Sequence, residues 1–507
     1  MSRTKNSMMN IVISLGGQVI LLFFSFLSRS VFINMLSEEY LGINGLFSSI
    51  LNMLSLAELG VGTAITYSLY KPIAKNDERK IKALMKFFKQ TYIAIGSVVL
   101  ILGLALTPFL EVFIKKMPDI PNLKLFYVIY LLNTAVSYFY AYKRTLISAN
   151  QKAYIATAYN QIFTIIRNVA QIMLLWTTRN FLFYLLAQIV CTVLENIAIS
   201  RKADAMFPYI KENCSEKLDK ETLGEIKRNT LATIFRKTST VVVMGTDNLL
   251  ISKFVGIAEV GVYSNYFMIT NSLNVIINQV FGALTASVGN LGVLEDSERT
   301  REIFKSTFLM GFWISGFITI CLYNLFNPFI TLWIGREYLF PTEVVLVIVF
   351  NFYITGMKST ANTFIEALGL YWYDRYKPIF ESIINLIVSL IMIRYLGVAG
   401  VFIGTAISTI TTCFWFEPYI LYKYGFKSSV NEYFVRYIVY SLVMLAAGWV
   451  TWMLCGLVTG VQLVSFLIKM LICAIVPNVL FLIAFYNTKE FQFLLGKLPQ
   501  KFRILKH

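Results

Sequence analysis

Four basic side chains lie inside stretches of this 507-residue chain that are otherwise apolar, namely Arg29, Arg167, Arg236 and Lys358. A charge inside a lipid bilayer is costly, so each of these side chains needs a partner, water or a ligand. The acidic residues at comparable positions are Glu58, Asp247 and Glu366. Because the cations outnumber them, the sequence predicts a positively charged cavity that binds an anion. The planar fork of arginine suits a phosphate in particular.

Polar residues in the same stretches recur at helical spacing. At 100° per residue, two positions eleven apart differ by about 20°, so they share one face of a helix. Three such stripes predict helices that line a water-filled cavity. Their members are Gln18, Ser25 and Arg29, then Asn160, Thr164, Arg167 and Gln171, then Arg236, Thr240 and Asp247.

Two interpretations of the uncharged polar residues stay open. Such side chains commonly hold membrane helices together through hydrogen bonds, with no ligand involved. A second question concerns Arg29 and Asp247, which lie at nearly the same predicted depth and are candidates for an outer gate that opens during transport. The alternative is that Arg29 pairs with Glu58 in its own half of the chain.

The elements that must position these residues are membrane helices. Hydrophobic residues make up 57% of the chain and charged residues 14%, a composition outside the soluble range. The expected fold class is all-α, a polytopic membrane protein with about 14 transmembrane helices. The predicted spans are 9–33, 41–69, 90–110, 125–148, 153–176, 181–200, 229–252, 260–293, 306–326, 342–369, 378–396, 399–421, 434–455 and 463–486.

Basic residues near the ends of these spans indicate the orientation. With the N-terminus placed in the cytoplasm, the inner segments hold 32 of the 45 lysines and arginines, and the outer segments hold 7. This asymmetry predicts that both termini are cytoplasmic. It also accounts for the net charge of +17 without a nucleic-acid partner, because no basic patch outside the membrane is interleaved with aromatic residues.

A repeat organises the predicted helices. The segment Leu41-Gly42-Ile43-Asn44 is echoed by Val260-Gly261-Val262-Tyr263, at an offset of 219 residues. Each copy holds an even number of spans, so the copies are parallel and not inverted. We expect two six-helix lobes and two further C-terminal helices, as in a transporter. The domain boundaries are an N-lobe with its linker at 1–228, a C-lobe at 229–425, and the last two helices with a basic tail at 426–507.

Three local motifs resemble the bacterial polysaccharide transporter family, the Wzx-type flippases of the multidrug/oligosaccharidyl-lipid/polysaccharide superfamily. They are SEEYLGINGLFS at 37–48, LSLAELG at 54–60 and YSLYKP at 67–72. The resemblance implies that an undecaprenyl-diphosphate-linked oligosaccharide crosses the bacterial plasma membrane by alternating access, for capsule or surface polysaccharide assembly. It also implies membrane lipids, a polysaccharide polymerase and glycosyltransferases as partners, and no cofactor.

Competing classes differ in the residues they need. A membrane-embedded glycan polymerase or ligase needs catalytic side chains, but the one histidine is His507 and no carboxylate pair stands out, so we expect no enzyme. A drug or cation antiporter of the same superfamily would favour acidic residues in its cavity. A lipid II flippase would share the basic cavity. The six cysteines are not at metal-ligand spacing, so no metal site is expected. Gly400 and Gly404 predict a close helix contact.

Overall fold

The computed structural model describes residues 3–55, 58–212, 218–294, 297–460 and 462–497, and the regular elements in these ranges are all helical. The helices form two compact units, Met1–Ser264 and Asn265–His507. The boundary falls inside one helix, α10 (Ile257–Leu294). The units reflect packing, whereas the predicted lobes reflect the repeat, so the boundaries expected near 228 and 425 stay predictions.

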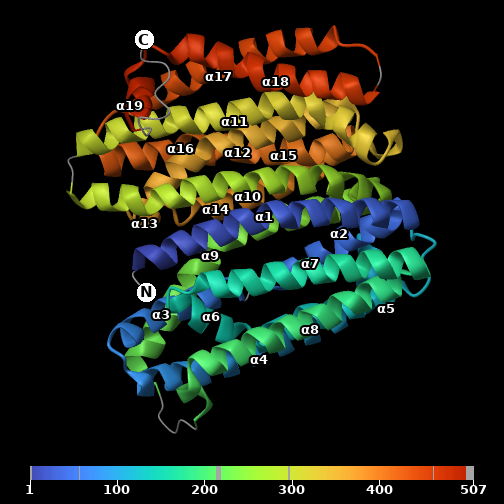
Figure 1. Cartoon of the computed structure of the whole chain (residues 1–507), viewed down its shortest axis with the longest axis vertical. Coiled ribbons are helices and arrows are strands. Elements are labelled where there is room, and N and C mark those ends of the chain that lie inside the picture. The colour runs from blue at the N-terminus through green and yellow to red at the C-terminus, as the bar shows by residue number, and fades with distance from the viewer. Residues whose placement is uncertain (1–2, 56–57, 213–217, 295–296, 461, 498–507) are drawn as a thin grey trace. The chain divides into compact units, whose positions relative to one another are not determined.

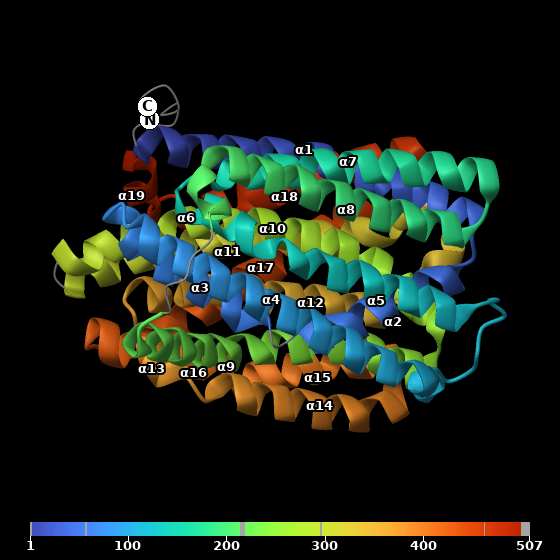
Figure 2. The same cartoon turned by 90° about the horizontal axis from the view of Figure 1, so that it is seen from below.

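The first unit has its aromatic core where α1, α2, α5 and α8 meet. Phe181, which is 2% exposed, packs edge-on against the rings of Phe32, Tyr40 and Phe126. Helix α5 runs between α4 and α8 (Figures 1 and 2). The helices of this unit are α1 (Arg3–Met35), α2 (Glu38–Leu54), α3 (Glu58–Ala74), α4 (Glu78–Leu106), α5 (Leu123–Phe139), α6 (Ala141–Ala149), α7 (Ala153–Thr178), α8 (Phe181–Met206), α9 (Lys220–Leu250) and the start of α10.

The second unit has an aromatic core between α11 and α17. Phe308 and Phe312 lie one turn apart on α11, and Tyr433 and Tyr440 of α17 stack on them with ring centroids 4.8 Å apart. Figure 1 shows α17 and α18 as a helical hairpin. The helices that follow α10 are α11 (Ser297–Trp333), α12 (Thr342–Ala367), α13 (Tyr371–Asp374), α14 (Lys377–Leu396), α15 (Val398–Thr411), α16 (Cys413–Ile420), α17 (Asn431–Gly456), α18 (Gln462–Phe485) and α19 (Lys489–Lys497).

Nine helices in the described ranges are long and apolar enough to cross a membrane. A tenth span results if α5 and α6, which are bent by 43° relative to each other, cross together. The fold is therefore that of an all-α, multi-pass membrane protein. Four predicted spans are not among the candidates, namely 41–69, 153–176, 229–252 and 260–293. The first of these is divided between α2 and α3, and the other three are helical but carry more polar side chains.

The predicted offset of 219 residues reappears in the helix boundaries. Helix α2 begins at Glu38 and α10 at Ile257, α4 begins at Glu78 and α11 at Ser297, and α5 begins at Leu123 and α12 at Thr342. Each pair of starts is 219 residues apart. Corresponding segments of the two copies therefore fold into corresponding helices.

The two copies of the repeat meet at a glycine crossing between α2 and the start of α10, inside the first unit. A Cβ added to Gly42 would collide with the carbonyl oxygen of Ile257, and one added to Gly261 would collide with the carbonyl oxygen of Glu38. Ile257 and Glu38 are themselves repeat equivalents, so the contact reads the same from either helix. Such reciprocity is the property of a contact around a two-fold axis. The absence of side chains at Gly42 and Gly261 lets the two backbones touch.

A second close approach confirms the predicted contact at Gly400 and Gly404. These glycines face α14, where added Cβ atoms would strike the carbonyl oxygen of Met392 and the side chain of Ser389. Figure 2 shows α14 and α15 side by side.

The glycine crossing makes a paired prediction. Gly42→Ala and Gly261→Ala should each lower the free energy of unfolding by about 1–3 kcal/mol, because each added methyl group overpacks a backbone contact. The two losses should be similar, since the contact is reciprocal. Gly282→Ala in α10 is the control, because a Cβ there meets no atom within 4 Å. Alanine is otherwise the better helix former, so this control should be neutral or more stable. Denaturation in detergent measures all three, and a neutral Gly261→Ala would contradict the crossing.

Candidate anion-binding site

Arg29 of α1 is held by neutral oxygen atoms. Its Nη1 donates a hydrogen bond to Oγ of Ser264, 3.1 Å away, and that hydroxyl donates to the carbonyl oxygen of Gly261 at 2.7 Å. The phenol groups of Tyr130 and Tyr184 are within electrostatic range of the guanidinium. Among the described residues no carboxylate lies within 4.0 Å of Arg29. Its positive charge is therefore anchored in place but not neutralised.

Arg167 of α7 lies near the same tyrosine. The phenol of Tyr184 in α8 is within electrostatic range of both arginines. Gln171, one turn beyond Arg167, donates through Nε2 to the backbone carbonyl of Tyr184 at 3.3 Å. In the described part of the chain, no carboxylate pairs with Arg167. The structure thus gathers Arg29, Arg167 and Gln171 around Tyr184, a residue that the sequence analysis did not single out.

The other members of these two stripes do not share one environment. Asn160 is exposed, and its Nδ2 donates to Oε1 of Glu195 at 3.2 Å. Thr164, Gln18 and Ser25 are half-buried. Two unpredicted polar side chains of α7, Gln161 and Asn168, are buried instead, and Gln161 bonds to the carbonyl of Ile13 in α1. Part of the polar surface of α7 therefore joins helices, as the alternative interpretation held.

Glu195 was overlooked as a membrane anion. It lies within the predicted span at 181–200 and forms an ion pair with Arg144 of α6. Close by, Lys143 contacts Asp204 at 2.7 Å and donates to Oγ of Ser200 at 2.8 Å. These acidic residues are taken up by the lysine and arginine of α6. They leave the charge of Arg29 and Arg167 unchanged.

The third stripe, on α9, is only partly described. The side chains of Arg236 and Thr240 lie outside the described residues, so their place in the cavity stays a prediction. Asp247 is 7% exposed, and its Oδ1 accepts no hydrogen bond from any described residue. Asp247 and Arg29 do not form an ion pair in this structure. Glu58, the alternative partner of Arg29, lies beside the phenols of Tyr92 and Tyr138. A gate formed by Arg29 and Asp247 therefore stays a prediction for another state.

Lys358 of α12, in the second unit, has a different environment from the arginines. Its Nζ lies 3.7 Å from Oε1 of Glu381 in α14. Lys377 forms an ion pair with Glu417 of α16, which is fully buried, and lies 3.1 Å from Oδ2 of Asp374. Two lysines thus face three carboxylates. The expectation that Lys358 adds to a surplus of positive charge is wrong, because it overlooked Glu381 and Glu417, which lie inside the predicted spans at 378–396 and 399–421.

Comparison with known proteins identifies the fold. No protein-family model and no curated protein matches the chain. Among solved structures, lipid II flippase MurJ in an inward closed conformation matches with a TM-score of 0.66 and 15% identity over 94% of this chain and 99% of that one.

Two transporters of the MOP superfamily also match. An inward-facing multidrug resistance MATE transporter has a TM-score of 0.63 and 16% identity, covering 81% of this chain and 98% of that one. A transporter from Pyrococcus furiosus, described as having a binding pocket of reversed polarity, has a TM-score of 0.52 and 15% identity, covering 85% and 98%. The chain therefore has the fold of MOP superfamily transporters, and the structures that it resembles are transporters, not enzymes.

The ion cluster of the second unit yields a stability prediction. Lys377→Met should lower the free energy of unfolding by ~3 kcal/mol, because it leaves the buried carboxylate of Glu417 without its closest cation. Adding Glu417→Leu should recover most of that loss, since an apolar pair can replace a buried ion pair. Glu302→Gln, which breaks an exposed pair with Arg299, is the control and should change stability by less than about 1 kcal/mol. Denaturation in detergent distinguishes these outcomes. A double variant as unstable as Lys377→Met would show that the pair itself is not what matters.

Proposed function

We propose that this protein is a flippase that moves a lipid-linked oligosaccharide across the membrane by alternating access. The observation that carries the proposal is the pair of arginines beside Tyr184, neither of which has a carboxylate partner among the described residues. Their charge is available to a phosphate, to which a guanidinium can donate two parallel hydrogen bonds. The proposed substrate is an undecaprenyl-diphosphate-linked repeat unit, whose diphosphate the arginines bind.

The remaining features of the proposal rest on the sequence. About 14 spans, both termini in the cytoplasm of a bacterium and two parallel lobes are the arrangement that the charge distribution and the 219-residue repeat favour. Arg236 is a further candidate ligand for the diphosphate. Assembly of a capsule or surface polysaccharide would make a polymerase and glycosyltransferases functional partners.

Two other substrates can be compared with this one. Lipid II is the second candidate, favoured by the similarity to MurJ over 94% of the chain. A cationic drug is disfavoured, because the unpaired arginines of the first unit would repel it. The shared chemistry of the first two candidates is a diphosphate joined to a polyprenol, so the arginines serve either one. The sugars distinguish them.

The arginines are the basis of a transport test. In cells that depend on this protein for surface polysaccharide, Arg29→Gln and Arg167→Gln should each lower export at least about tenfold, the effect of losing one charge-assisted hydrogen bond. Arg29→Lys and Arg167→Lys should retain more activity, because the charge remains while the fork is lost. Lipid-linked precursor should accumulate in the defective cells.

The control for this test is Arg394→Gln, at an exposed arginine near the end of α14. Protein levels in the membrane should be equal in all variants. Normal export by both glutamine variants would rule out the arginine site. Proteoliposomes that move lipid II, but not the undecaprenyl-diphosphate oligosaccharide, would move the assignment to the second candidate.

A further inference from the structure

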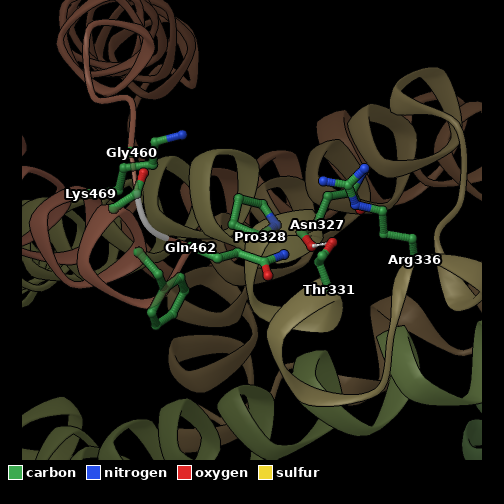
Figure 3. Close-up of a pocket in the computed structure, with 9 residues that line it drawn as sticks. Asn327, Pro328, Thr331, Arg336, Gly460, Gln462 and Lys469 are labelled. Atoms are coloured by element: carbon green, nitrogen blue, oxygen red, sulfur yellow. Dashed lines mark hydrogen bonds between the residues drawn. The ribbon is translucent and has the colours of Figure 1, made fainter.

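A polar pocket lies in the second unit, apart from the arginines around Tyr184. It has a volume of about 430 Å³ and is formed by the end of α11, the turn that follows and the start of α18. Figure 3 shows Arg336 and Gln462 reaching in from opposite sides toward Asn327 and Thr331. Lys469 of α18 also lines the pocket.

The pocket is electropositive. Arg336 and Lys469 contribute two cations, and none of the residues that line it is acidic. Glu337, next in sequence to Arg336, lies against Gly335 instead. Across the described residues, neither cation has a carboxylate within 4.0 Å. Helix α18 begins at Gln462, so the positive end of its dipole adds to the field of the two side chains.

The neutral side chains of the pocket can bind the surroundings of an anion. Gln462, Ser465 and Lys469 lie at positions i, i+3 and i+7 of α18, on one face of the helix. Asn327 and Thr331 lie one turn apart on α11. Amide and hydroxyl groups of this kind bond to phosphate oxygens and to the hydroxyl groups of a glycerol or sugar. The pocket therefore suits a phosphate with hydroxyl groups beside it.

The position of the pocket indicates that a lipid supplies this phosphate. Both α11 and α18 are candidate membrane spans, and Lys469 lies seven residues into α18, about 10 Å along its axis. Leu463, Val464 and Leu467, beside the pocket residues, are 45–57% exposed and can contact acyl chains. Phe329 stacks on Trp333 with ring centroids 5.7 Å apart, as aromatic residues do at the level of lipid headgroups.

We propose that this pocket binds the phosphate of an anionic phospholipid headgroup, in the leaflet next to the turn between α11 and α12. The sequence predicts this leaflet to be the outer one. Arg336 and Lys469 hold the phosphate, and Gln462, Ser465 and Thr331 bond to its neighbouring oxygen atoms. The bound lipid bridges the hairpin of α17 and α18 to α11. The ordinary alternative is that both cations only reach for water at the membrane surface.

Lipid retention by the purified full-length protein tests this site. The protein is placed in nanodiscs of phosphatidylcholine with a minor fraction of phosphatidylglycerol, released, and analysed by native mass spectrometry. Wild type should retain at least one phosphatidylglycerol molecule that Arg336→Gln with Lys469→Gln loses, and each single variant should bind it about tenfold more weakly. Arg394→Gln, an exposed arginine outside the pocket, is the matched control.

Further arms distinguish the sources of phosphate and the two proposals. Excess inorganic phosphate should not displace the lipid, and displacement would show a site for soluble phosphate instead. Arg29→Gln should retain phosphatidylglycerol normally, so failure of the flippase proposal leaves this result unaffected. Equal retention by wild type and the double variant would overturn the lipid site. If the double variant does not fold, Arg336→Gln alone, at an exposed residue, decides the question by the same comparison.

Discussion

The contact of Gly42 with Ile257 and of Gly261 with Glu38 determines how the two copies of the repeat meet. Backbones touch there because neither glycine has a side chain, and the next polar contacts continue from this point. Asn248 of α9 donates to Oγ of Ser49 in α2 at 2.9 Å. On the other side, Ser264 bonds to the carbonyl of Gly261 and accepts a hydrogen bond from Arg29. The proposed phosphate-binding arginine is thus linked to the crossing through one serine.

This link has a consequence for alternating access. A crossing without side chains allows two helices to rotate against each other with few rotamer changes, whereas interlocked side chains would resist that rotation. If α2 and α10 change their angle during transport, Ser264 moves with α10 and Arg29 loses or regains its hydrogen bond. The orientation of the guanidinium is then coupled to the state of the transporter, as a two-state cycle requires.

The two units treat membrane charge in opposite ways. In the first unit, Arg29 and Arg167 face phenols, hydroxyls and amides, which solvate a cation without cancelling it. In the second, Lys358 and Lys377 face Glu381, Glu417 and Asp374. A neutralised cluster contributes to the fold, because breaking it leaves a buried charge. An uncancelled charge is available to an anion, and we therefore place the substrate phosphate in the first unit.

The sequence by itself determined the class, the repeat and the positions of most helices. Hydropathy and helical spacing are local properties, so the apolar spans and the offset between Gly42 and Gly261 could be recognised without a structure. The close contact at Gly400 and Gly404 was also predictable, since small residues one turn apart form a helix face.

Only the tertiary structure decided which charges meet. Lys377 and Glu417 are 40 residues apart, and Cys455 and Cys473, whose sulfur atoms are 3.8 Å apart, are separated by 18 residues. The pocket joins Arg336 to Lys469 across more than a hundred residues. Periodicity gives the face on which a side chain lies but not the helix that covers that face. Whether a membrane cation is neutralised or free to bind a phosphate depends on that second helix, so packing alone could separate Lys358 from Arg167.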